Sequence, residues 1–223
     1  MNEPENKKRV WDPIHIIVGI VALLRVIGAI IPSFNTVSEK STQSATLGNA
    51  RQVITALKLY AGDHNGAYPD SALPDAKSSN EVFRLLIREG ILEDERIFGA
   101  KVSPFVPDND IGEAPLYGKA LEAGENHWAM VKGLSDEAVA TSVVILENPV
   151  TASPLRWAKG DGEKAFKGRT WRGEAIIVGF NDTSVQAVKL LPDPSNPSRL
   201  MMPTHPDWFP ISPSNPPVLD VLE

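Results

Sequence analysis

The sequence predicts an α+β fold in which a long amino-terminal helix packs on a small antiparallel β-sheet. Three observations lead to this prediction. Residues 14–31 are almost uniformly apolar, apolar side chains from Leu47 to Ala61 recur at three- and four-residue steps, and short β-branched runs follow later in the chain. The long helix is therefore expected to have a membrane-spanning half and an amphipathic half.

Residues 14–31 have the length and composition of a membrane-spanning helix. At 1.5 Å per residue they extend ~27 Å, close to the ~30 Å hydrocarbon thickness of a bilayer. Twelve of these 18 residues are Ile, Val or Leu. Each of them favours insertion by roughly 0.3 to 0.6 kcal/mol, which together outweighs the cost of about 2.5 to 3.5 kcal/mol for Arg25.

The basic residues Lys7, Lys8 and Arg9 orient this segment. Cytoplasmic flanks carry an excess of Lys and Arg, so residues 1–10 are expected in the cytoplasm and everything after Pro32 outside it. A cleaved signal peptide and a buried helix of a soluble protein are the alternatives. Residues 32–35 make a poor cleavage site, because such sites end in small residues.

His15 and Arg25 are the polar residues of the apolar segment that we expect to make helix contacts. An isolated arginine in lipid reaches a phosphate or meets an acidic side chain of another protein. Simple snorkelling toward the membrane surface is the alternative.

Beyond the membrane segment the helix is expected to stop near Gly62, where Asn65, Gly66 and Pro69 favour a turn. Ser78 forms a capping box with a glutamate three residues later, ahead of a second, short amphipathic helix. Residues 127–131, 142–146, 175–180 and 185–190 are predicted strands, the last two joined as a hairpin.

Nine prolines among residues 192–223 predict an extended tail without helix or sheet, held in place by Trp208 and Phe209. The predicted organisation has five parts. They are a basic leader (1–10), a transmembrane helix (11–34), the outer half of the long helix (35–62), an α+β globular domain (63–191) and the Pro-rich tail (192–223).

Composition excludes several classes of function. The net charge of −6 argues against nucleic acid as a partner. The chain has no cysteine, which excludes a disulfide framework, a thiol nucleophile and a thiolate metal site.

The sequence carries no recognisable catalytic motif. Its four histidines lie singly, without a spacing that places two metal ligands on one helix face, and no serine lies in a known nucleophile motif. Asp108 and Asp110 offer hard oxygen ligands for calcium, with an ordinary polar turn as the alternative. We therefore expect neither enzyme activity nor a cofactor, with calcium as the one cation to consider.

A local basic stretch with two indoles is a candidate partner surface. It could meet an acidic partner or a glycan, with a solvated loop as the alternative. Its residues are Trp157, Lys164, Arg169, Trp171 and Arg172.

The order of these features resembles the type IV pilin superfamily, in particular the pseudopilins of type II secretion systems. The matching stretches are residues 30–34, 49–52, 60–69, 124–128, 175–178 and 182–185. Two hallmarks of processing are missing. Val10 stands where the family has the glycine before the cleavage point, with Trp11 as the first mature residue, and His15 stands where the family has glutamate.

The resemblance implies a bitopic protein of the bacterial inner membrane with a pilin-like periplasmic or extracellular domain. It would act as a structural or assembly component, and its partners would be membrane lipid and other pilin-like subunits or membrane proteins of the apparatus. The missing hallmarks suggest that the leader is retained. An anchored glycan- or peptide-binding module is the alternative function, and an anchored hydrolase ranks last because no nucleophile is recognisable.

Overall fold

The computed structural model describes residues 13–101, 103–160 and 164–223. In helix α1 (Pro13–Asp63), the side chains of residues 13–16, 23–24 and 26–38 are not among those described. The chain divides into two compact units, Met1–Ser41 and Thr42–Glu223. The second is called the globular unit below, and it holds every strand of the described chain.

Within the globular unit, α1 contributes a buried stripe at helical spacing. Ala50, Ile54, Leu57 and Ala61 are fully buried, as the amphipathic pattern predicts. The N–H of Gly66 donates a hydrogen bond to the carbonyl of Ala61 at 2.8 Å. The φ angle of Gly66 is 82°, a conformation that glycine adopts without strain. The chain thereby turns out of the helix close to the predicted point.

Three short helices follow: η1 (Pro69–Ser71), α2 (Ser79–Arg88) and η2 (Glu95–Phe98). Ser78 caps α2, since its hydroxyl accepts the N–H of Glu81 at 3.4 Å and donates to the Glu81 carboxylate at 3.3 Å. The predicted second helix and its cap are confirmed.

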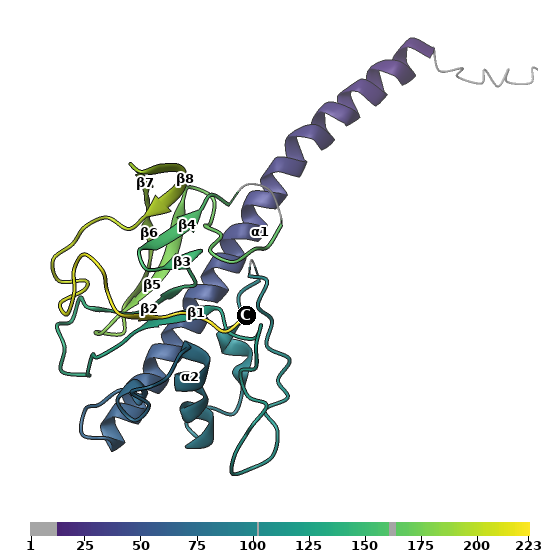
Figure 1. Cartoon of the computed structure of the whole chain (residues 1–223). Coiled ribbons are helices and arrows are strands. Elements are labelled where there is room, and N and C mark those ends of the chain that lie inside the picture. The colour runs from purple at the N-terminus through teal and green to yellow at the C-terminus, as the bar shows by residue number, and fades with distance from the viewer. Residues whose placement is uncertain (1–12, 102, 161–163) are drawn as a thin grey trace, which may run out of the picture. The chain divides into compact units, whose positions relative to one another are not determined.

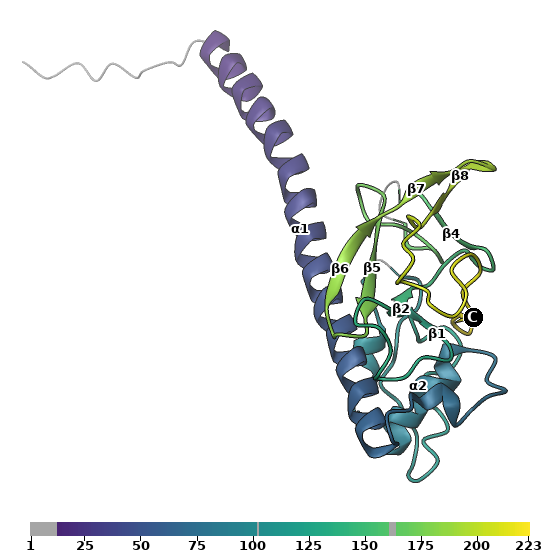
Figure 2. The same cartoon turned by 90° about the vertical axis from the view of Figure 1, so that its left-hand side faces the viewer.

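The larger sheet has five strands in the order β6-β5-β2-β1-β9, all antiparallel (Figure 1). Their bounds are β1 Trp128–Val131, β2 Val143–Glu147, β5 Ala175–Phe180, β6 Val185–Lys189 and β9 Val218–Leu219. Both faces of β2 are buried, because every residue from Val143 to Glu147 is buried. In both views, α1 within the globular unit runs alongside this sheet (Figure 2).

The smaller sheet has four strands in the order β3-β4-β8-β7. Their bounds are β3 Thr151–Ala152, β4 Leu155–Ala158, β7 Leu191–Asp193 and β8 Asn196–Met201. Leu155 and Trp157 of β4 point into the core, together with Leu200 of β8. The two sheets share one hydrophobic core.

The predicted fold class, a pilin-like α+β fold with one small sheet under a long helix, is wrong. In the part of the chain that the structure describes, nine strands form two antiparallel sheets in place of one small sheet, and the helices of the globular unit apart from α1 are short. The four strands predicted from sequence are present with bounds shifted by at most one residue. The missed strands are two to six residues long and lack an apolar run of their own.

The Pro-rich tail was predicted to lie outside any sheet, and this is also wrong. It supplies β8, β9 and part of β7. Pro192 lies in an edge strand and Pro197 near the start of β8, where a missing N–H costs little. Phe209 is buried as expected, and the chain end closes on the domain through bonds from Ser79 N–H to the Asp220 carbonyl and from Gly124 N–H to the Leu222 carbonyl.

Candidate functional site

The described part of the apolar segment presents a broad apolar face. Ile17, Val18, Ile20 and Val21 expose 59, 63, 53 and 47 % of their surface. At 100° per residue these side chains and the exposed Arg25 fall within about 160° of the helix circumference. Arg25 therefore lies on the same face as the apolar residues, between the directions of Val18 and Val21.

The membrane predictions concern the first 34 residues of the chain. Among the residues that the structure describes, no helix combines the length and apolarity that crossing a membrane requires. Most of the predicted spanning segment, residues 14–31, falls on residues whose side chains are not described, and this includes His15. The basic leader, residues 1–10, and the degenerate cleavage point at residues 10–11 lie outside the described residues.

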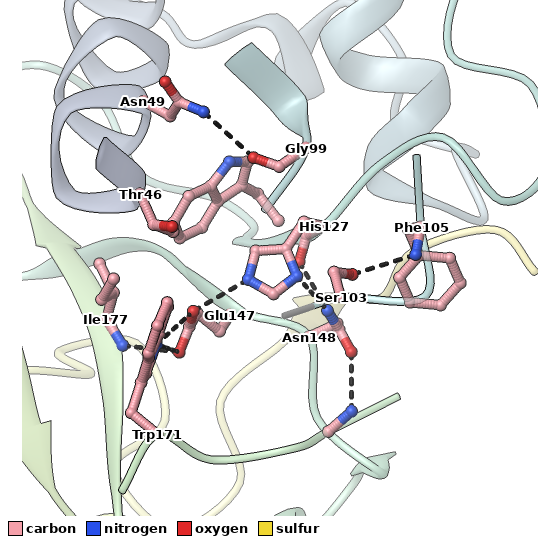
Figure 3. Close-up of polar contacts among 12 residues, drawn as sticks. Thr46, Asn49, Gly99, Ser103, Phe105, His127, Glu147, Asn148, Trp171 and Ile177 are labelled. Carbon is pink, nitrogen blue, oxygen red and sulfur yellow. Dashed lines mark hydrogen bonds and ion pairs between the residues drawn. The ribbon is translucent and has the colours of Figure 1, made fainter. Parts of the chain in front are cut away.

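A buried polar network is centred on Glu147, at the end of β2 (Figure 3). The Glu147 carboxylate accepts a hydrogen bond from His127, with 2.9 Å between Nε2 and Oε1. It also accepts the Trp171 indole N–H, whose nitrogen lies 2.9 and 3.0 Å from the two carboxylate oxygens. It also accepts the backbone N–H of Ile177 at 2.9 Å. Glu147 and His127 expose only 1 and 3 % of their surface. A buried carboxylate is stable only when it is bonded in this way.

The second nitrogen of His127 is also engaged. Its Nδ1 accepts the side-chain amide of Asn148 at 2.8 Å, and Asn148 in turn accepts the N–H of Gly168 at 2.8 Å. This arrangement assigns the Nε2–H tautomer, with a neutral imidazole between carboxylate and amide. Both ring nitrogens are thus hydrogen-bonded within the chain. The network links the residue before β1 to the end of β2 and to β5.

Three carboxylates gather at a second place. Oxygens of Glu95, Asp108 and Glu125 lie within 4.8 Å of one another, and Glu95 is fully buried. Burial raises the pKa of Glu95, with Asp108 adding to the rise, while the N–H groups of Leu121 and Asn109 oppose it. Burial likewise raises the pKa of Glu125, and Glu95 and Asp108 contribute.

Carboxylate oxygens are ligands for a hard cation such as calcium, but several oxygens of this cluster already accept backbone N–H groups. Glu95 accepts the N–H groups of Asn109 at 2.6 Å and Leu121 at 3.0 Å, and Glu125 accepts that of Glu122 at 2.5 Å. Of the two predicted calcium residues, only Asp108 belongs to the cluster. Asp110 forms an ion pair with Lys119 at 2.6 Å instead.

The predicted partner surface does not form as a platform. Trp157 and Trp171 are buried, with their indole N–H groups bonded to the Glu147 carbonyl and carboxylate respectively. Arg169 is also buried, whereas Lys164 and Arg172 are exposed. The two indoles were assigned to the surface in error. A large aromatic ring stabilises the fold more when it is buried, and the spacing of the two tryptophans in the sequence does not show whether they point into the core or to solvent.

A hollow of about 360 Å³ lies where the tail meets β4 and β8. It is lined by Leu155, Met201, Met202, Phe209 and several prolines. The guanidinium of Arg156 at its border is bonded to Asp193. Neither this hollow nor a second one of about 320 Å³ beside Phe105 is lined by His127 or Glu147.

Sequence reasoning missed Glu147 and Asn148 as organising residues. The available signal was a carboxylate directly after an apolar run, because a charge that ends a buried strand needs internal partners. Glu95 was also missed, although it opens the helical turn η2, whose apolar residues Ile97 and Phe98 are buried.

Comparisons with models of protein families, with curated proteins and with solved structures give no match for this chain. The resemblance to pseudopilins therefore depends on the sequence motifs alone.

Proposed function

We propose that this chain is a structural or assembly subunit of a type II secretion or type IV pilus-like apparatus and that it is not an enzyme. Residues 14–31 anchor it in the bacterial inner membrane as a single span, with the amino terminus in the cytoplasm and the globular unit in the periplasm or outside the cell. Its partners are membrane lipid and other membrane-anchored subunits of the same apparatus.

The observation that carries this proposal is the exposed apolar face of α1 with Arg25 within it. Four exposed large apolar side chains in five residues need either lipid or another helix to cover them. An arginine on such a face favours a partner that supplies an acidic group or a phosphate. The flanking apolar sequence of residues 14–31 supports lipid as the surroundings.

The internal hydrogen bonding of the buried His127 and Glu147 in the globular unit supports a role without catalysis. Its buried histidine and carboxylate bond to each other and to fixed donors, and they line neither described hollow. The alternative, an anchored glycan- or peptide-binding module, loses the two indoles on which it depended, because both are buried.

Replacement of Arg25 tests the proposal. Arg25→Leu should leave the chain in the membrane and reduce recovery of co-purifying subunits at least fivefold in detergent pull-downs from the native host. Arg51→Leu is the matched control, since Arg51 is also exposed on α1 but belongs to the globular unit. Equal recovery with wild type and Arg25→Leu would remove the helix contact from the proposal.

A further inference from the structure

The hollow of about 360 Å³ where the tail meets β4 and β8 is lined by two methionines and a histidine. Met201 is the last residue of β8, Met202 follows it, and His205 lies three residues further along the chain. The second hollow, beside Phe105, is lined by neither residue type. Methionine sulfur is a soft metal ligand and imidazole also binds transition metals, so the lining of the first hollow carries three candidate metal donors.

The pairing of β4 with β8 places the two methionines at one end of the smaller sheet. The strands are antiparallel with Trp157 opposite Leu200, and continuing this register brings Met202 opposite Leu155. Met202 exposes only 7 % of its surface and belongs to the hydrophobic core, whereas Met201 is half-buried and lies outside that core. Packing in the core therefore accounts for one of the two thioethers and not for the other.

The imidazole of His205 is positioned by a stack of aromatic rings. The rings of His205 and Trp208 stack with centroids 5.3 Å apart, and the half-buried Trp208 contacts Phe180 of β5 with centroids 5.8 Å apart. The Asp207 N–H donates to His205 Nδ1 over a long 3.4 Å, and Nε2 has no hydrogen-bond partner among the described residues. Unlike His127, whose ring nitrogens are both bonded within the chain, His205 can give a nitrogen lone pair to a metal.

The backbone that carries these donors is stiff. Pro203 lies between Met202 and His205, and Pro206 follows His205 directly. Each proline fixes its own φ angle and restricts the residue before it to extended conformations. Less conformational freedom is therefore lost when the three side chains bind a common ion.

The charges around the hollow favour a soft ion over a hard one. Among the residues that line it there is no aspartate or glutamate, and the guanidinium of Arg156 is bonded to the Asp193 carboxylate. Calcium and magnesium need oxygen ligands, chiefly carboxylates. Two thioethers and an imidazole are neutral, and a single positive charge costs less to remove from water than a double one.

We propose that Met201, Met202 and His205 bind one Cu(I) ion in this hollow. Thioether ligands select Cu(I), and the chain has no cysteine, so methionine sulfur is the softest donor it possesses. Zn(II) prefers thiolate, imidazole and carboxylate ligands and binds here more weakly. The inference goes beyond the assembly role and does not depend on the membrane anchor.

Competition for Cu(I) between the full chain in detergent and a chromogenic Cu(I) chelator, under anaerobic reducing conditions, tests the site. One Cu(I) should bind per chain, and Met201→Leu and Met202→Leu should each lower the affinity about tenfold or more. Leucine conserves the volume of methionine, so these variants keep the fold. Met130→Leu is the matched control, because Met130 is buried in β1, does not line the hollow and should bind Cu(I) as wild type does.

The histidine is tested in the same assay. His205→Asn should lower the affinity for Cu(I) by a similar factor, whereas His64→Asn, at a histidine that does not line the hollow, should leave it unchanged. Bound Cu(I) should also quench the fluorescence of Trp208, because this indole stacks on the imidazole. Trp208→Phe should remove most of the quenching and retain binding of the ion.

Two results would overturn the inference. The first is that the wild-type chain binds no Cu(I), or that the double variant Met201→Leu with Met202→Leu binds it as tightly as wild type. The second is that Zn(II) binds the wild-type chain as tightly as Cu(I) does and binds the double variant equally well. That outcome would show a site built on the imidazole without the thioethers.

Discussion

At the scale of single residues, Glu147 shows how one buried charge can connect separated segments. Its carboxylate accepts hydrogen bonds from His127, which precedes β1, from the Trp171 indole and from Ile177 of β5. Sequence alone could locate His127 and Trp171 near predicted strands. It could not show that both face the same carboxylate, because that depends on the pairing of β1 with β2 and of β2 with β5.

Glu147→Gln should lower the free energy of unfolding by about 2 to 4 kcal/mol. The amide nitrogen must then face N–H donors of Trp171, Ile177 or His127, which leaves buried donors without acceptors. Urea unfolding at pH 7 measures the change. Glu122→Gln, an exposed control, should change stability by less than ~0.5 kcal/mol. Equal midpoints for the two variants would contradict the network.

The acidic cluster predicts a dependence of stability on pH. The pKa of Glu95 is raised in the folded state, so folding favours its protonated form. The resulting stabilisation is complete below the ordinary glutamate pKa of about 4.3 and is lost as pH rises through the raised value. Asp108→Asn removes one of the charges that raise this pKa and should recover about 0.5 kcal/mol at pH 7.

Urea unfolding between pH 4 and pH 8 tests this expectation. The difference in midpoint between wild type and Asp108→Asn should grow with pH, whereas Asp75→Asn, at an exposed residue outside the cluster, should give a constant difference. A pH-independent difference for Asp108→Asn would show that the three carboxylates do not interact.

At the scale of elements, the sequence was sufficient to predict a helix or strand where the segment itself has a cap, an amphipathic stripe or an apolar run. Helix α2 has a cap and an amphipathic stripe, and β1, β2, β5 and β6 are apolar or β-branched runs. Strands β3, β4, β7, β8 and β9 were missed because β3 and β9 are only two residues long and the other three include prolines or charges. Their pairing depends on neighbours distant in sequence, such as β4 with β8.

The contact between α1 and β5 within the globular unit depends on Gly179. A Cβ atom at this position would lie 2.2 Å from Ile54 Cδ1 and 3.0 Å from Ile145 Cγ1. Gly179→Ala should therefore destabilise the domain by about 1 to 3 kcal/mol through overpacking. Ile54→Val removes the closest atom and should recover part of this loss in the double variant.

A double-mutant cycle in urea measures the coupling between Gly179→Ala and Ile54→Val. Gly118→Ala is the control, because a Cβ there meets nothing within 4 Å. Additive losses in the double variant would mean that helix and strand do not meet at this point.

At the scale of the whole molecule, the predicted fold class was wrong because the sequence did not show that the Pro-rich tail contributes strands to both sheets. The excess of proline in residues 192–223 predicts an unpaired segment. Yet these residues supply β8 and most of β7 in the smaller sheet and the edge strand β9 of the larger one. The candidate surface failed for a related reason, since its two indoles are core residues. The apolar amino-terminal segment remains the feature from which the function is proposed.

Alkaline carbonate extraction of bacterial membranes that contain the full chain tests the central claim most directly. Wild type should stay in the membrane pellet, and the double variant Val18→Asp with Val21→Asp, which charges the exposed apolar face, should be released. Leu59→Asp is the matched control, because Leu59 is equally exposed on α1 within the globular unit, and it should stay in the pellet. Release of the intact wild-type chain into the supernatant would contradict the proposed anchor and the assembly role that depends on it.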